Sequence, residues 1–109
     1  MIALFSTFRA NSDPAARELR DRLLGMAAPT RSEPGCVAYE VLATADEATT
    51  LYVIEAWNTR GDAERHARRV VDDGLVARAE ALLNGPITSL WLEPATPAEP
   101  QHGWGREIR

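Results

Sequence analysis

The sequence predicts a small α+β domain in which four strands form one antiparallel sheet and helices cover one face of that sheet. Three observations predict it. The chain has 109 residues and is 45% apolar, which is the size and composition of one ordinary domain. Four apolar segments alternate from residue to residue, as strands do. The stretches between them show the three- and four-residue apolar spacing of amphipathic helices.

The first strand and the first helix are predicted near the N-terminus. Residues 1–9 carry apolar side chains on both faces of an extended chain, which indicates a strand that is covered on both sides. Asp13 followed by Pro14 predicts a helix start, because aspartate accepts hydrogen bonds from free amides and proline has no amide to leave unpaired. Pro29 is expected at or close to the end of this helix. Its apolar stripe consists of Ala16, Leu19, Leu23, Met26 and Ala27.

A tight turn and a hairpin are predicted next. Pro34 and Gly35 occupy the central positions of a turn that begins at Glu33, which favours a type II turn. Strands over residues 36–43 and 51–57 then flank a polar loop, as in an antiparallel hairpin. One face of the returning strand carries Leu51, Val53, Glu55 and Trp57.

Two short helices and a last strand complete the prediction. Thr59 and Asp62 have the spacing of a capping box, and they open a helix whose apolar stripe includes His66. Asp72 or Asp73 is expected to cap another helix. A strong stop signal follows at Asn84-Gly85-Pro86, and residues 87–93 are predicted to be the fourth strand.

The element order βαββ(αα)β is that of a ferredoxin-like protomer with helices on one side of the sheet. The opposite sheet face is then free to pair. Because a short chain buries a small fraction of its surface, we expect a homodimer. Residues 1–94 are expected to form the domain. Residues 95–109 are expected to be an irregular tail with Trp104 as its only large anchor, either draped over a partner subunit or disordered.

Composition excludes several classes of function. The formal charge is −4 and the basic residues are scattered among acidic ones, so nucleic acid is not expected as a partner. The N-terminal segment is too short and too polar for a signal peptide or a membrane span, so we expect a cytoplasmic protein with no membrane partner. All 12 basic residues are arginines, which excludes lysine Schiff bases and a Walker lysine.

Metal and nucleotide sites are not expected either. Cys36 is the only cysteine, so an intrachain disulfide and a four-cysteine site are excluded. The two histidines, His66 and His102, stand in no metal-ligand spacing, and the glycines are too far apart for a phosphate loop.

The chain resembles the antibiotic biosynthesis monooxygenase family over roughly residues 1–94. The resemblance lies in the order and spacing of three segments, which cover residues 32–40, 51–57 and 63–66. It implies a dimeric α+β barrel, in which ferredoxin-like protomers pack sheet to sheet across a dimer axis. It also implies chemistry, because better-characterised members oxidise polycyclic aromatic phenols or quinols with O2 and no cofactor. One branch of the family degrades haem, and many members have no established activity.

The chain departs from the family pattern at several positions. Many relatives carry a second histidine where this chain has Val71, so a mechanism that uses a histidine pair is not expected. Thr7, His66 and Val76 stand near the positions of the haem-degrading asparagine, tryptophan and histidine, so haem degradation is disfavoured. Val53 replaces an asparagine of the aromatic-oxidising relatives.

The candidate site combines a proton acceptor with aromatic side chains. His66 is the first candidate for a base, because the unperturbed pKa of histidine, about 6.5, lies near physiological pH. Glu55 is the second, and its cost of burial requires a partner, either an arginine or His66. Trp57, Tyr39 and Phe5 are expected to line the pocket. A purely structural interpretation stays open for His66, Trp57 and Tyr39 as ordinary core residues, with His66 hydrogen-bonded to Glu55 or to a backbone carbonyl. The arginines at positions 65, 68 and 69 are expected to form a solvated helix face, with anion binding as the alternative.

The resemblance and this candidate site together imply a monooxygenase that needs no metal or organic cofactor and oxidises a phenolic, quinol or polycyclic aromatic substrate with O2. The alternative is a dimeric aromatic-ligand-binding or stress-response protein without turnover. Fold alone does not decide between them.

Overall fold

The computed structural model describes residues 1–96, and the predicted tail with Trp104 lies almost entirely outside them. The described chain contains the predicted elements in the predicted order, except that two helices follow the first strand where one was predicted. They are β1 (Ile2–Arg9), α1 (Asp13–Gly25), α2 (Ala27–Arg31), β2 (Cys36–Ala43), β3 (Thr50–Trp57), α3 (Arg60–Asp72), α4 (Leu75–Glu80) and β4 (Thr88–Leu92).

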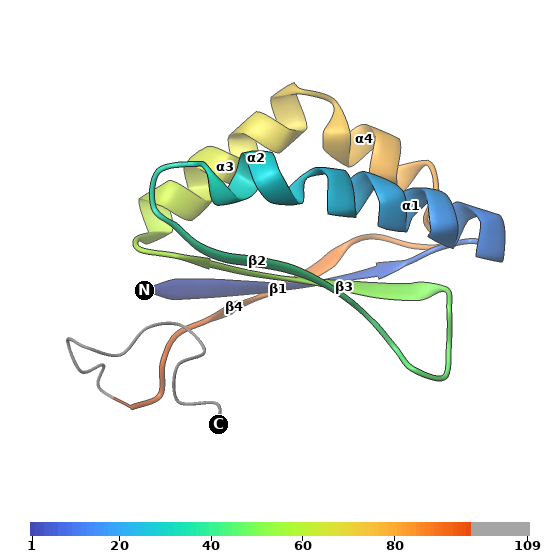
Figure 1. The fold of residues 1–109 in the computed structure, drawn as a ribbon, viewed down its shortest axis with the longest axis horizontal. Helices are drawn as coiled ribbons and strands as arrows, with labels where there is room; N and C mark the ends of the chain where they lie inside the picture. The colour runs from blue at the N-terminus through green and yellow to red at the C-terminus, as the bar shows by residue number, and fades with distance from the viewer. Residues whose placement is uncertain (97–109) are drawn as a thin grey trace.

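The four strands form one antiparallel sheet in the order β2-β3-β1-β4. All the helices lie on one face of this sheet, as Figure 1 shows. This is the ferredoxin-like arrangement that the element order predicted. In the centre of the sheet Leu4 stands opposite both Glu55 and Trp91, and Phe5 opposite both Ile54 and Leu90. Because side chains alternate along a strand, Leu4 and Phe5 lie on opposite faces.

The main core lies between the helices and the sheet. Leu19 of α1 is completely buried, and it packs in one cluster with side chains of three strands. Truncation of such a side chain to alanine typically costs about 2–5 kcal/mol of folding free energy. The largest fully buried side chains of the described residues are Trp57, Tyr39, Leu19 and Leu51.

Three details of the helix ends differ from the prediction. Ser12, not Asp13, caps α1, because its hydroxyl accepts a hydrogen bond from the backbone N–H of Ala15 at 3.1 Å. Pro29 lies inside the short helix α2 and does not end α1; it is tolerated because the first N–H groups of a helix have no partner within it. Gly74, not an aspartate, caps α4, since one residue with φ of 76° makes the reversal from α3.

The turn at Pro34 and Gly35 is tied to the start of α3. The N–H of Cys36 donates to the carbonyl of Glu33 at 3.1 Å, and Gly35 has a φ of 84°. The carbonyl of Gly35 also accepts from the N–H of Asn58 at 2.8 Å. A β-carbon at position 35 would collide with the carboxylate of Asp62. The turn is therefore fixed in both conformation and place.

Within residues 1–96, no helix covers the other face of the sheet (Figure 1). Leu90 is 61% exposed and Leu42 is 46% exposed on this face. We call this surface the open sheet face. Strand alternation assigns to it Phe5, Leu42, Tyr52, Ile54, Leu90 and Leu92. Separately, none of the helices within residues 1–96 has the length and apolarity needed to cross a membrane.

Candidate functional site

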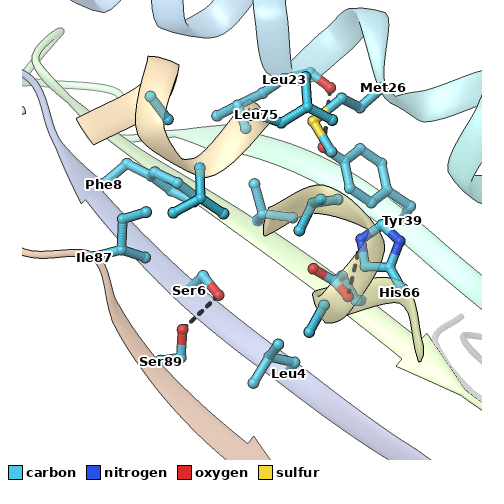
Figure 2. A pocket seen from close by; sticks show the side chains of 16 residues that line it. Leu4, Ser6, Phe8, Leu23, Met26, Tyr39, His66, Leu75, Ile87 and Ser89 are labelled. Atoms are coloured by element: carbon cyan, nitrogen blue, oxygen red, sulfur yellow. Dashed lines mark hydrogen bonds and ion pairs between the residues drawn. The ribbon is translucent and has the colours of Figure 1, made fainter. Parts of the chain in front are cut away.

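A cavity of about 180 Å³ lies between the helices and the sheet. Sixteen side chains line it, and Figure 2 shows them converging from β1, β4, the hairpin strands and the helices. Most of them are apolar. The polar groups among the lining residues belong to Ser6, Tyr39, Glu55, His66 and Ser89. The cavity therefore offers an apolar interior with a small number of polar contacts, which is typical of a small-molecule site.

The helix α3 places His66 at this cavity. Thr59 caps the helix by accepting from the N–H of Asp62 at 3.1 Å, as the capping-box spacing predicted. His66 then falls on the buried stripe of α3 with Ala63, and only 4% of its surface is exposed. Its ring lies 5.0 Å from the ring of Trp57, centroid to centroid, at an interplanar angle of 33°.

The carboxylate of Glu33 contacts His66 at Nδ1 of the ring. The carboxylate oxygen Oε2 of Glu33 lies 2.8 Å from Nδ1 of His66. The same oxygen lies 2.9 Å from the guanidinium of Arg69, one helical turn further along α3. Only 11% of the Glu33 side chain is exposed, so this contact is largely shielded from solvent. The purely structural interpretation of His66 named Glu55 or a backbone carbonyl as its partner, and the structure shows Glu33 instead.

Glu55 lies on the other side of the imidazole. Its Oε1 accepts a hydrogen bond from Nε1 of Trp57 at 2.9 Å and lies 3.9 Å from Nε2 of His66. Burial raises the pKa of this carboxyl, and the negative charge of Glu33 raises it further. His66 and the Trp57 hydrogen bond act in the opposite direction but do not cancel the effect of burial. Of the two expected partners, His66 is the one nearby, and Trp57 is the hydrogen-bond donor that sequence reasoning missed.

The ring of Tyr39 lines the cavity, and its hydroxyl forms a hydrogen bond that stabilises the fold. The hydroxyl donates to the backbone carbonyl of Leu23 at 3.0 Å, near the end of α1. Burial, together with the charge of Glu55, raises the pKa of Tyr39 far above that of a free tyrosine. The hydroxyl therefore stays protonated, and Tyr39 is not a proton acceptor at neutral pH.

Trp57 and Phe5 do not line this cavity, contrary to the expectation. Trp57 is completely buried beside it, in a small cluster with Ile2 and Ala63. Phe5 lies on the open sheet face, where its ring stands 5.4 Å from that of Tyr52. The alternation of β1 explains the error for Phe5, because it points away from Leu4, Ser6 and Phe8. Phe8 provides the aromatic ring that β1 contributes to the cavity.

Several site residues carried no clear signal in the sequence. Glu33 was interpreted only as the first residue of a turn, and Arg69 only as part of a solvated basic helix face. Ser6 and Ser89 were not singled out, although a serine on an otherwise apolar strand face was a detectable signal. Their hydroxyls lie 2.9 Å apart at the cavity wall (Figure 2).

No metal centre or reactive thiol is found in the part of the chain that the structure describes. Within residues 1–96, no group of three or more histidine, cysteine, aspartate or glutamate side chains is placed to hold a metal ion. Cys36 is half-buried, and burial together with the charges of Glu55 and Glu33 raises the pKa of its thiol. This favours the neutral thiol, which is the less nucleophilic form.

Comparison with known proteins gives one family and many similar folds. The family model described as antibiotic biosynthesis monooxygenase matches residues 1–70, which include Glu33, Glu55 and His66. No curated protein sequence matches the chain.

Among solved structures, Rv0793 from Mycobacterium tuberculosis is 28% identical with a TM-score of 0.79, and the match covers 90% of this chain and 98% of that one. PA3566 from Pseudomonas aeruginosa is 26% identical with a TM-score of 0.76, over 87% of this chain and 94% of that one. SnoaB from Streptomyces nogalater, a cofactor-independent oxygenase, is 16% identical with a TM-score of 0.74, over 88% and 94% of the two chains. At that identity SnoaB supports the fold alone.

Proposed function

Because the chain belongs to the antibiotic biosynthesis monooxygenase family, we propose that it is a monooxygenase that oxidises a phenol or quinol with O2 and needs no cofactor. The observation that carries this proposal is the meeting of His66 and Glu55 at one wall of a largely apolar cavity. Such a cavity binds an aromatic ring, and these two side chains are placed to remove a hydroxyl proton from it.

The size of the cavity favours a single aromatic ring. A buried apolar cavity of about 150 Å³ is known to hold benzene, and the cavity here is about 180 Å³. A polycyclic substrate is larger than this volume and would have to extend beyond it. Within the range of substrates that the sequence predicts, we therefore favour a one-ring phenol or hydroquinone.

The proposed reaction needs little from the protein beyond a base and an oriented ring. Removal of the hydroxyl proton makes the ring electron-rich, so it can transfer electrons to O2 and form a carbon–oxygen bond to it. The O–O bond then breaks as the ring carbon loses its hydrogen and becomes a carbonyl. One oxygen atom enters the product, and the other leaves as water with the two hydrogens that the substrate loses. All four electrons that reduce O2 come from the substrate.

The side chains divide this work. His66 or Glu55 accepts the hydroxyl proton, while the rings of Tyr39 and Phe8 flank the substrate. Ser6 of β1 pairs with Val53 of β3, and Glu55 lies two residues further along β3. Ser6, which contacts Ser89, is therefore the diagonal neighbour of Glu55 across the two strands. Diagonal neighbours of this kind are about 7–8 Å apart, which suits a ring that carries oxygens at opposite ends.

We further propose that the protein works as a homodimer through the open sheet face. That face exposes large apolar side chains, which a second copy of the chain would cover. Two sheets packed face to face would form a dimeric α+β barrel. A cytoplasmic location stays a prediction from the sequence.

A second candidate function is binding of an aromatic molecule without turnover. Val53 favours it, since this side chain lines the cavity at the position where, by the family resemblance, aromatic-oxidising relatives carry an asparagine. The cavity then lacks one hydrogen-bonding group for an oxygen intermediate.

Oxygen uptake with a size-graded panel tests the proposal. Phenols and hydroquinones of one ring would be compared with anthrones of three rings, each corrected for autoxidation. We expect protein-dependent uptake that is greatest for one-ring substrates. Saturable quenching of tryptophan fluorescence by the same compounds, without uptake from any of them, would instead support the binding function.

A further inference from the structure

We propose that Glu33 is a positioning residue that holds His66 in the tautomer with its proton on Nδ1, so that the lone pair of Nε2 is the one available beside Glu55 at the cavity. This inference rests on the proposed function, since an oriented Nε2 has a chemical role only if a substrate proton is transferred there. Its test can nevertheless be read without any activity.

The contact between Glu33 and His66 determines which nitrogen carries the proton. An ionised carboxylate can only accept hydrogen bonds, so the 2.8 Å contact requires Nδ1 to donate. A neutral imidazole has one N–H and one lone pair. If the proton lies on Nδ1, the lone pair must lie on Nε2.

Arg69 strengthens this arrangement from the same helix. Its guanidinium forms an ion pair with the same Oε2 of Glu33, with a nitrogen–oxygen distance of 2.9 Å. The carboxylate thus has a cation beside it and a hydrogen bond to the imidazole, and a hydrogen bond to an ionised carboxylate is of the strong, charge-assisted kind. Among the basic residues of α3, Arg65 is occupied elsewhere, because it binds Asp62 and the carbonyl of Pro34.

The backbone around Glu33 keeps the carboxylate in place. Its N–H donates to the carbonyl of Thr30 at 3.0 Å, and its own carbonyl accepts from Cys36. The carbonyl of Gly35 accepts a hydrogen bond from the N–H of Asn58, which connects the turn to the loop before α3. A side chain on such a turn loses little freedom when it binds His66, which favours a fixed orientation of the ring.

The other nitrogen of His66 is free for chemistry. The oxygen of Glu55 lies 3.9 Å from Nε2, which is too far for a hydrogen bond, and that oxygen already accepts from Trp57. A substrate hydroxyl at this point would meet a lone pair on Nε2 and a carboxyl oxygen of Glu55. The charged groups that face the ring are therefore Glu33 on one side and Glu55 on the other.

Nitrogen NMR of the imidazole tests the inference. The protein would be labelled with ¹⁵N-histidine, and the signals of His66 would be assigned by their loss in His66→Gln. At a pH where the ring is neutral, we expect Nδ1 to be protonated and Nε2 to be unprotonated in the wild type. A wild-type spectrum with the proton on Nε2 would overturn the inference, and this result does not require a folded Glu33 variant.

Two matched variants then isolate the carboxylate. Glu33→Gln keeps the size of the side chain but can donate as well as accept, so the population of the Nε2–H tautomer should rise. Glu40→Gln removes an exposed carboxylate from a different ion pair, with Arg31, and should leave the spectrum unchanged. An unaltered tautomer in Glu33→Gln would contradict the role of Glu33.

Kinetics separates this inference from the proposed function. In Glu33→Gln we expect kcat for oxygen uptake to fall about 10-fold or more, as is typical for loss of a partner that orients a functional histidine, with KM little changed. An Nδ1–H tautomer in a wild-type protein that consumes no oxygen would refute the oxygenase proposal and leave the positioning by Glu33 intact. Normal kcat in Glu33→Gln, despite a changed tautomer, would refute the catalytic importance of the positioning.

Discussion

At the scale of single residues, the buried group around His66 is the feature that separates this protein from an ordinary small fold. Two carboxylates flank one imidazole, and one of them, Glu33, is neutralised by Arg69. The other, Glu55, has a tryptophan N–H as its hydrogen-bond donor. A buried carboxylate without a cationic partner reduces stability when it is ionised, so its presence indicates a role other than stabilising the fold.

The raised pKa of Glu55 gives a pH-dependent stability. The folded protein binds the Glu55 proton more tightly than the unfolded chain does, where the pKa is about 4.3. The contribution of Glu55 to stability is therefore complete below that pH and is lost as the pH rises through the raised folded pKa. Glu55→Gln cannot ionise and its carbonyl still accepts from Trp57. We expect the variant to gain stability over the wild type as the pH rises from about 4 to 8.

Urea unfolding at a series of pH values measures this difference. Glu40→Gln is the control, since Glu40 is exposed and should show little pH-dependent difference from the wild type. If the difference in unfolding free energy between Glu55→Gln and the wild type stayed constant across this pH range, the pKa of Glu55 would not be raised.

At the scale of elements, the turn at Gly35 links the hairpin to α3 and so holds Glu33 over His66. Gly35→Ala would combine a positive φ with a collision against Asp62, and we expect a loss of about 1–3 kcal/mol of folding free energy. Gly25→Ala is the control, because no atom lies within 4 Å of its new β-carbon and it is expected to gain about 0.4–1 kcal/mol. Chemical denaturation of both variants checks the prediction, and equal stabilities would contradict it.

The sequence predicted the elements well because their signals are local. The alternation of strand residues, the cap at Thr59 and the Pro34-Gly35 turn each depend on a few neighbouring residues, and all were confirmed. The errors at Ser12, Pro29 and Gly74 concern helix ends, where a shift of one residue changes which group forms the cap. The contact of Glu33 with His66 spans 33 residues, and only the assembled fold shows it.

At the scale of the whole molecule, the proposed dimer rests on the open sheet face. Leu90→Glu would place a carboxylate in the proposed dimer interface, on the edge strand β4, and we expect the protein to become monomeric. Light scattering on a size-exclusion column would then give the 12.0 kDa mass of one chain, against twice that mass for the wild type. Leu24→Glu is the control, since Leu24 is 50% exposed on α1 and should leave the dimer intact. A monomeric wild type would refute the dimer.

Some features of the whole molecule could be predicted from the sequence and others could not. Residue pattern predicted which side chains share a strand face, such as Val53, Glu55 and Trp57, but not which face of each strand lies against the helices. Pattern gave no distance between elements, so the volume of the cavity and the exclusion of Trp57 from its wall were not accessible. The placement of Phe5 was accessible, because strand alternation alone separates it from Leu4 and Phe8.

Oxygen uptake by chelator-treated protein, with the best one-ring substrate, tests the central claim most directly. The wild type would be compared with His66→Gln and with Arg68→Gln, which alters an exposed residue on the same helix. We predict that the wild type and Arg68→Gln consume oxygen at similar rates above autoxidation, and that His66→Gln loses about 100-fold or more in kcat, as expected for loss of a general base. Equal rates in His66→Gln and the wild type would contradict the role of His66 as the base.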